Sequence, residues 1–258
     1  MRLYIAGIES YCLPDTKNCL TIPKNSYILT SFYYCTDKSI QYVLNAVGND
    51  RILLDSGGYT FRKYGIEGED IEHFTNRYID FINKYDIKYF FEMDVDETLE
   101  DLPYIKELRN RIETKTGKKC IPVWHLTRGI EEWYKMCEDY EYIAIGDVGR
   151  LKKYAPQALK KMLRYSNSHG VRVHGLGYAV DDAASLGFYS VDASSWNGYK
   201  YGNVFYYDKE KNKPIVYKPL FKKTRLKDTY AKEVLQNNLD AWLYYQQYLK
   251  NKGYWKNC

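Results

Sequence analysis

The sequence predicts a single-domain α/β protein with a parallel sheet, and at 258 residues a (β/α)₈ barrel is the expected architecture. Eight short apolar segments recur along the chain, and most are followed by residues with helical spacing. Six of these segments end in Asp or His, where barrel enzymes place their active sites. A doubly wound open sheet is the alternative, disfavoured because no Gly-x-Gly-x-x-Gly or phosphate-binding loop follows the first segment.

The first half of the chain predicts five strands separated by helices. The strands are expected at residues 3–8, 27–32, 51–55, 88–96 and 120–125. Helices are expected from Asp37, a candidate N-cap, to Gly48, and over residues 69–85 and 98–116. Residues 9–25 form a polar loop whose length is typical of functional or mobile loops.

The second half continues the alternation. Strands are expected at residues 142–149, 171–177 and 188–192, and helices at residues 130–140, 156–169 and 181–186. Residues 199–217 then alternate aromatic and polar side chains around a polar turn, which predicts a β-hairpin. A basic segment, 218–227, leads to a helix over residues 229–250. We therefore expect residues 1–198 to form the barrel and residues 199–258 to pack on it.

Composition limits the classes of protein to which the chain can belong. With 45% hydrophobic and 28% charged residues the chain can bury a substantial core, and its net charge of +5 permits a polyanionic partner without requiring one. Its six cysteines form no Cys-x-x-Cys pair. The amino-terminal segment is too short for a signal peptide, and no apolar run reaches the roughly 18 to 20 residues of a membrane span. We therefore expect a cytoplasmic protein without membrane contact.

Acidic residues and histidines at the strand ends are the main functional indication. They are Asp55, Asp94, Asp96, His125, Asp147, His174 and Asp192. In a barrel these ends converge on one face, so the side chains would lie together. The alternative is that some of them only form turns, since Asp and Gly are ordinary turn residues.

The pattern favours a ligand rich in hydrogen-bond donors over a metal ion. Asp94 and Asp96 are two residues apart, so on a strand both carboxylates would face the same way and repel each other. A metal could relieve that repulsion, but the four histidines form no His-x-His or His-Glu-x-x-His pair. The N1–H and 2-amino edge of a guanine-like base fits better, and we expect no metal or other cofactor.

One motif carries a resemblance to a known family. Asp55-Ser56-Gly57-Gly58-Tyr59 resembles the Asp-Ser-Gly-Gly-Phe signature of tRNA-guanine transglycosylases, which are (β/α)₈ enzymes. Later segments follow a similar order: Asp96-Glu97, a Gly-containing strand at 142–149, His-Gly-Leu-Gly at 174–177, and Val191-Asp192. The resemblance covers roughly residues 51–202.

The resemblance implies a reaction and a set of site residues. Asp192 would attack the anomeric carbon of a nucleotide and displace guanine, Asp55 would act as general acid/base, and a 7-deazaguanine would take the place of guanine. Either Asp94 or Asp96 would bind the base edge. The residues expected at the substrate are Ser56, Gly57, Gly58, Asp94, Asp96, His125, Gly146, Asp147 and His174.

Departures from the family pattern change the expected substrate. The run Val191-Asp192-Ala193-Ser194-Ser195-Trp196 holds one Asp, where the family has a further Phe-Asp-Cys segment, and Thr60 replaces the family's Gln. The family's zinc-binding cysteines and its added RNA-binding domain are missing. The chain is thus more similar to short phage and genomic-island relatives that insert 7-deazaguanines into DNA. This favours DNA over tRNA, a free base like preQ0 or preQ1, and a phage-encoded enzyme acting in the host cytoplasm.

Two segments predict contact with nucleic acid. Tyr199, Lys200 and Tyr201 follow the expected nucleophile. Lys222, Lys223 and Arg225 lie in the basic segment. Lysine and arginine can neutralise phosphates and tyrosine can stack on an exposed base, whereas the alternative for the basic segment is a solvated linker. A duplex would also need its target nucleotide flipped out.

Two other functions stay open from the sequence. A barrel glycoside hydrolase or nucleoside deoxyribosyltransferase could use the same two carboxylates on small nucleosides. A non-catalytic relative could bind nucleic acid without turnover. Whether the chain forms a homodimer is left open.

Overall fold

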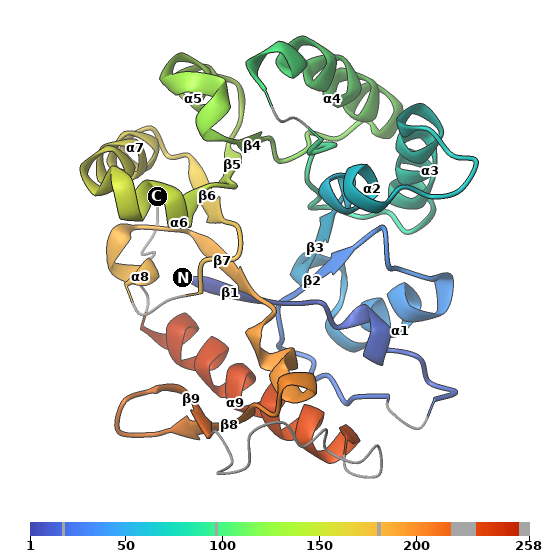
Figure 1. Cartoon of the computed structure of the whole chain (residues 1–258), viewed down its shortest axis with the longest axis vertical. Coiled ribbons are helices and arrows are strands. Elements are labelled where there is room, and N and C mark those ends of the chain that lie inside the picture. Colours follow the sequence, from blue (N-terminus) through green and yellow to red (C-terminus); the bar gives the residue numbers. More distant parts are fainter. Residues whose placement is uncertain (17–18, 96–97, 180–181, 218–230, 253–258) are drawn as a thin grey trace.

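A computed structural model describes residues 1–16, 19–95, 98–179, 182–217 and 231–252. Its centre is a curled parallel sheet of seven strands, in the spatial order β3-β2-β1-β7-β6-β5-β4 (Figure 1). The strands are β1 (Arg2–Ala6), β2 (Ile28–Ser31), β3 (Ile52–Asp55), β4 (Val123–Trp124), β5 (Tyr142–Ile145), β6 (Arg172–Gly175) and β7 (Ser190–Ala193). The predicted α/β class with a parallel sheet is confirmed.

The fourth predicted strand, residues 88–96, does not form as a strand. Phe90 pairs with Leu54 of β3 and Phe91 with Ile121, but these are isolated bridges. Backbone hydrogen bonds of 2.9 Å from Phe91 N to Leu54 O and 2.8 Å from Ile121 N to Phe90 O hold the segment there. Beyond it the backbone of Gly58 lies close to that of Asp94, since a Cβ added to Gly58 would lie 2.9 Å from Asp94 O. The described sheet is therefore curled but is not a closed eight-stranded barrel.

Helices follow most strands and cover the outer face of the curl (Figure 1). They are α1 (Asp37–Val47), α2 (Gly58–Tyr64), α3 (Ile71–Lys84), α4 (Leu102–Thr116), α5 (Gly129–Asp139), α6 (Val148–Tyr154), α7 (Pro156–Ser168) and α8 (Ala183–Leu186). Short 3₁₀ turns lie at Glu9–Tyr11, Asn49–Arg51, Leu99–Asp101, Leu126–Arg128 and Ser195–Tyr201. Thr36, not Asp37, caps α1, because its hydroxyl accepts a hydrogen bond from Ser39 N.

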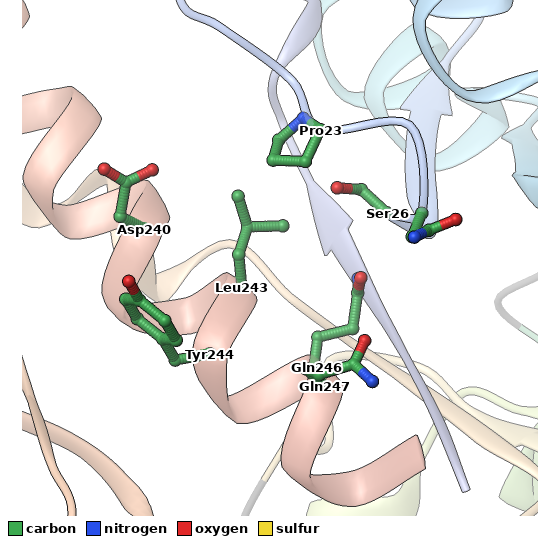
Figure 2. Close-up of a pocket in the computed structure, with 8 residues that line it drawn as sticks. Pro23, Ser26, Asp240, Leu243, Tyr244, Gln246 and Gln247 are labelled. Atoms are coloured by element: carbon green, nitrogen blue, oxygen red, sulfur yellow. The ribbon is translucent and has the colours of Figure 1, made fainter. Parts of the chain in front are cut away.

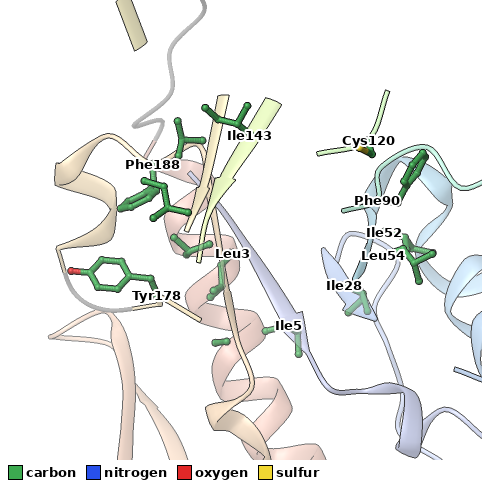
Figure 3. Close-up of a cluster of buried hydrophobic side chains, with 14 of the residues drawn as sticks. Leu3, Ile5, Ile28, Ile52, Leu54, Phe90, Cys120, Ile143, Tyr178 and Phe188 are labelled. Atoms are coloured by element: carbon green, nitrogen blue, oxygen red, sulfur yellow. The ribbon is translucent and has the colours of Figure 1, made fainter. Parts of the chain in front are cut away.

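Alternation along each strand divides the core into two layers. On β1, Leu3 and Ile5 face the helices, whereas Tyr4 and Ala6 face the interior of the curl. Figure 3 shows part of the outer layer, including Leu3, Leu54 and Phe188. The inner layer holds Tyr4, Ala6, Tyr27, Leu29, Leu53, Phe91, Ile121, Val123, Tyr142 and Ala144. Side chains therefore fill the interior of the curl, as they do in small barrels.

The C-terminal part forms a hairpin and a long helix, as predicted. Strands β8 (Val204–Asp208) and β9 (Lys213–Tyr217) pair antiparallel, and α9 (Ala231–Asn251) packs on the hairpin and on β1. Two buried amides fix α9. Gln246 Nε2 donates to Leu3 O at 2.7 Å, and Asn238 Nδ2 donates to Trp196 O at 3.1 Å. Across the described ranges, no helix is both long enough and apolar enough to cross a membrane.

Candidate functional site

The carboxyl ends of the parallel strands bring most of the predicted site residues to one edge of the sheet. Asp55 ends β3 and lies in register with Ser31, the last residue of β2. His125 follows β4, Asp147 follows β5, and Asp192 lies on β7. Because all these strands run in the same direction, the side chains share the face where α/β proteins bind ligands. We call this face the mouth.

Asp192 is held by one of its two carboxyl oxygens. Its side chain is largely buried, and Oδ1 accepts hydrogen bonds from Gly177 N at 2.7 Å and from His174 Nε2 at 3.2 Å. Within the described ranges, no hydrogen bond to Oδ2 is found. The carboxylate is therefore oriented through Oδ1, and Oδ2 is available to a ligand.

A buried chain of hydrogen bonds continues below Asp192. His174 Nδ1 lies 2.7 Å from Ser190 Oγ, which lies 2.5 Å from the hydroxyl of Tyr142. A carboxylate only accepts, so His174 must donate from Nε2, and the Nδ1 of a neutral imidazole then accepts from Ser190. Ser190 in turn accepts from Tyr142. All protons of this chain, which we call the donor chain, are thus directed toward Asp192.

His174 has a different position from the one predicted. It was expected to touch the substrate, but its side chain is fully buried on β6, beneath Asp192. The tyrosine and serine of the donor chain were not predicted, because they lie within apolar strands. Their signal in the sequence is a hydroxyl group within an otherwise apolar strand.

Asp55 is placed to hold a proton. Burial, with a smaller contribution from the negative charges of Asp94 and Asp192, raises the pKa of its carboxyl to about 6, against the opposing effects of Ser31 and Gly57 N. An acid whose pKa lies near neutrality can donate a proton and take it back. The pKa therefore suits Asp55 to general acid/base chemistry.

Glu9 is a second buried carboxyl beside Asp55, and the prediction missed it. Its Oε1 accepts from Ser31 N at 3.3 Å, while Oε2 is buried without a hydrogen-bond partner in the described part of the chain. Burial raises the pKa of Glu9 to about 7, and the charge of Asp55 contributes. Glu9 directly follows the first predicted strand, so the strand-end rule that selected the other acids would have found it.

The Asp-Ser-Gly-Gly segment is both a turn and part of the site. Gly57 adopts a left-handed conformation with φ +71° before the first turn of α2, and a Cβ on it would lie 2.5 Å from Tyr33 Cβ. A Cβ on Gly58 would lie 2.9 Å from Asp94 O. The buried Ser56 Oγ accepts from Gly58 N at 3.3 Å and from Asp94 N at 3.5 Å. The two glycines and the serine therefore fix Asp94 next to Asp55.

His125 lies between two carboxylates. Its Nε2 is 2.8 Å from Asp94 Oδ1, and its Nδ1 is 3.3 Å from Asp147 Oδ2. Asp147 also accepts from Leu126 N at 3.0 Å. A Cβ on Gly146 would lie 2.2 Å from His125 Cε1, so only glycine leaves room for this imidazole. The imidazole therefore orients Asp94, which was predicted to bind the base edge.

A buried ion network supports this side of the mouth. Glu92, which has no exposed surface, accepts from Arg109 Nε at 2.6 Å, from Arg128 Nη1 at 2.7 Å and from Val123 N at 2.7 Å. Burial would raise the pKa of Glu92, but the two guanidinium groups outweigh it and hold the pKa below its usual value. Arg128 Nη2 also lies 3.9 Å from Asp94 Oδ1, so the network reaches the site.

The predicted nucleic-acid contacts are described only in part. Tyr201 is 76% exposed, whereas Tyr199 is half-buried and packs on the core. The predictions for Asp96, Lys222, Lys223 and Arg225 lie outside the described residues, as does that for the side chain of Lys200.

Among the described residues no group of three or more His, Cys, Asp or Glu side chains is arranged to hold a metal ion.

A cavity of about 410 Å³ lies away from the acids of the mouth. Figure 2 shows it between α9 and the residues that precede β2. It is lined by Pro23, Asn25, Ser26, Asp240, Leu243, Tyr244, Gln246 and Gln247. Because β2 begins at Ile28, this cavity is at the amino ends of the strands, on the face opposite the mouth. Its residues supply controls for experiments on the mouth.

Comparison with known protein families and curated sequences found no match. No protein-family model matches the chain, and no curated protein sequence matches it.

Proposed function

We propose that the protein is a transglycosylase that exchanges guanine for a 7-deazaguanine base in nucleic acid, with DNA as the substrate rather than tRNA. The observation that carries the proposal is Asp192, whose Oδ1 is held by two donors while Oδ2 accepts no hydrogen bond from the described residues. Asp55, a carboxyl whose pKa is raised to about 6, lies close enough for the charge of Asp192 to act on it. A fixed carboxylate and a nearby proton donor are the two groups that retaining glycosyl transfer needs.

The scaffold fits the barrel that such chemistry uses. We propose that residues 89–92 occupy the position of the missing eighth strand between β3 and β4. The bridges of Phe90 to Leu54 and of Phe91 to Ile121 support this position. The ring of strand ends would then surround the substrate, as in (β/α)₈ enzymes.

The first half of the reaction would form a covalent intermediate. Asp192 Oδ2 attacks C1′ of the target nucleotide, and the bond from C1′ to N9 of guanine breaks. The electron pair of that bond stays on guanine, which takes a proton from the carboxyl of Asp55. The product is a glycosyl ester on Asp192, a carboxylate on Asp55 and free guanine.

The second half would restore the enzyme. Asp55 removes the N9 proton of the incoming 7-deazaguanine, whose nitrogen attacks C1′ and displaces the Asp192 carboxylate. Asp94, oriented by His125, accepts hydrogen bonds from N1–H or the 2-amino group of either base. The two displacements retain the configuration at C1′, and neither step requires a metal or an added cofactor.

The test is incorporation of a labelled base. Wild-type protein is incubated with radiolabelled 7-deazaguanine bases and either double-stranded DNA or tRNA, and the label in the polymer is counted. We expect incorporation into DNA, none with Asp192→Asn, and wild-type incorporation with Asp240→Asn, which changes a carboxyl group in the distant cavity. No incorporation into either polymer, with no covalent adduct on Asp192, would refute the proposal.

The same assay separates the alternatives. Cleavage or base exchange on free nucleosides, without incorporation into polymers, would assign the protein to the nucleoside deoxyribosyltransferases or glycoside hydrolases. Polymer binding that survives the double change of Asp55→Asn and Asp192→Asn, without any turnover by the wild type, would assign it to non-catalytic binding proteins.

A further inference from the structure

Two helices that were not predicted lie at the mouth and end in the same way. Helix α2 follows β3 and ends Arg62-Lys63-Tyr64, and helix α6 follows β5 and ends Lys152-Lys153-Tyr154. Each is a short extra helix that precedes the longer helix packed on the sheet, α3 or α7. Figure 1 shows them on either side of the strands.

Contacts within the structure place the end of α2 on the mouth. Arg62 Nη1 donates to the carbonyl oxygen of Val95 at 2.5 Å, and Val95 is the neighbour of Asp94. The hydroxyl of Tyr33, two residues beyond β2, donates to Gly65 O at 2.8 Å. The last turn of α2 is therefore tied to two of the loops that surround the acids.

The end of α6 is tied to the mouth in the same way. Lys152 Nζ lies 2.6 Å from Asp182 Oδ2 and 5.4 Å from the ring centre of Tyr178. Asp182 and Tyr178 both lie in the segment that follows β6. The same segment contains Gly177, whose N–H donates to Asp192. The two helix ends thus lie at the mouth, where α2 follows β3 and α6 follows β5.

The last two residues of each helix form a pair of one cation and one aromatic ring. Lys63 Nζ lies 5.2 Å from the ring centre of Tyr64, and Lys153 Nζ lies 4.8 Å from that of Tyr154. We call these the rim pairs. Tyr64 is 68% exposed and Tyr154 is 73% exposed. Among the described residues neither lysine has a carboxylate partner, so both the rings and the charges face solvent.

We infer that the rim pairs bind a single-stranded segment of nucleic acid across the mouth. A lysine can neutralise a phosphate, and an exposed tyrosine can stack on a base, so a cation beside an aromatic ring matches the repeating unit of an unpaired strand. An acidic peptide would satisfy the lysines but would leave the two rings in water. The net charge of +5 attracts either polymer, and the rings favour the nucleic acid.

The choice of a nucleic-acid partner rests on the proposed function and deepens it. A nucleotide whose C1′ reaches Asp192 must leave its duplex or come from an unpaired region. Its neighbours on the strand would then cross the rim on both sides of the target. The two rim pairs would hold these neighbours, one at the end of α2 and the other at the end of α6.

Direct binding tests this inference. The probe is a fluorescein-labelled single-stranded DNA of about 20 nucleotides, longer than the roughly 4 to 16 that one binding site covers, and the readout is fluorescence anisotropy. Tyr64→Ala and Tyr154→Ala should each raise Kd about 5- to 150-fold, the effect of losing one stacked base. The double change Lys63→Ala and Lys153→Ala should lower the slope of log Kd against log salt by about 1.4, or about 0.7 for each phosphate contact.

Matched controls come from the opposite face. Tyr244, which is 64% exposed, lines the distant cavity, and the exposed Lys24 precedes β2. Tyr244→Ala removes the same atoms as each tyrosine variant, and Lys24→Ala removes one of the two charges that the double variant removes. Both should leave Kd and its salt slope unchanged. All of these side chains are exposed, so circular dichroism should show folded protein for every variant.

The outcomes separate this inference from the proposed function. Three results would each overturn the inference that the rim pairs bind nucleic acid. They are equal losses of binding in the rim and control variants, no binding of the probe by the wild type, and stronger binding of polyglutamate than of DNA. If the rim variants still incorporate base and bind DNA with unchanged Kd, the role of the rim pairs is rejected and the proposed function stands. If binding depends on the rim pairs but the protein exchanges no base, the role of the rim pairs stands and the proposed function is rejected.

Discussion

His174 Nε2 lies 3.2 Å from Asp192 Oδ1, in a region where His174 has no exposed surface. The histidine cannot touch a substrate there, so its influence on the reaction passes through Asp192. Ser190 and Tyr142 hold the imidazole so that its Nε2–H donates to Asp192 Oδ1. Oδ2 of Asp192 is then left for nucleophilic attack. His174 is therefore a positioning residue in the proposed reaction.

Removing the donor of His174 should slow formation of the covalent adduct. His174→Leu deletes a hydrogen bond to a charged group, worth about 1.5 to 3 kcal/mol, so the single-turnover rate should fall about 10- to 150-fold with an unchanged KM for DNA. His174→Gln retains an N–H group near the position of Nε2 and should restore much of the rate. A structural role alone would lower the amount of folded protein and leave the rate per folded molecule unchanged.

A change at Tyr142, the far end of the donor chain, should slow adduct formation less than a change at His174. Tyr142→Phe removes a neutral hydrogen bond, worth about 0.5 to 1.5 kcal/mol, and should slow adduct formation roughly 2- to 12-fold. Tyr42→Phe is the matched control, because the Tyr42 hydroxyl donates to Leu20 O at 2.7 Å, away from the mouth. Equal rates for the two variants would show that the chain does not act on Asp192.

The rate of adduct formation should depend on the protonation of Asp55. Its pKa is raised to about 6, chiefly by burial, so the acid form is present below pH 6 and is lost as the pH rises. The single-turnover rate should be constant near pH 5 and fall about tenfold per pH unit above pH 6. Asp55→Asn should lose both the rate and this dependence. A flat profile between pH 5 and pH 8 for the wild type would exclude Asp55 as the acid.

Glu9 should make the folded state less stable at alkaline pH. Its pKa is raised to about 7 from 4.5, mainly by burial, so the folded protein binds the proton more tightly than the unfolded chain does. The free energy of unfolding should therefore fall as the pH rises from about 4.5 to about 7, by up to about 3 kcal/mol. Glu9→Gln removes the ionisation and should stabilise the protein by a similar amount at pH 8, with little effect at pH 4.

Urea unfolding at several pH values measures this effect. Glu138→Gln is the control, because Glu138 is exposed on α5, and it should leave the pH dependence unchanged. If Glu9→Gln destabilises the protein at pH 8, then the carboxylate of Glu9 has a partner that offsets its burial.

A methyl group at residue 146 should displace His125. In Gly146→Ala the Cβ would lie 2.2 Å from the imidazole, and overpacking of this kind costs about 1 to 3 kcal/mol of stability. Asp94 would also lose its hydrogen bond, so base exchange should fall at least about tenfold. Gly149→Ala is the control, because nothing lies within 4 Å of its added methyl group. Calorimetry and the incorporation assay measure the two effects, and equal results for both variants would contradict this account of Gly146.

The alternation of strands and helices was predictable because apolar periodicity is local. Helices α2 and α6 were missed because each has seven residues with few apolar side chains, so neither shows a helical stripe. The segment at Phe90 and Phe91 has strand character in sequence. It pairs only through the isolated bridges to Leu54 and Ile121, which lie more than 25 residues away in the sequence and leave no local pattern.

The acids of the mouth were predictable because topology alone gathers strand ends. The partners of each acid were not. Tyr142 and Ser190 are 48 residues apart, and they meet only because β5, β6 and β7 lie side by side in the sheet. The same alignment brings His174 beneath Asp192. In sequence, a histidine at a strand end looks the same whether it faces the substrate or supports the residue that does.

The position of β1 has a consequence for how the chain is made. β1 pairs with β7 across most of the sequence, with Arg2 opposite Ser190, and α9 reaches it later still through Gln246. At about 5 to 20 residues per second, β1 is synthesised roughly 10 to 40 s before β7, its second neighbour in the sheet. Throughout that interval one edge of a buried strand is unpaired, and a hydrophobic strand edge is a template for wrong association. The edge of β1 that pairs with β7 is therefore covered only after about three quarters of the chain has been synthesised.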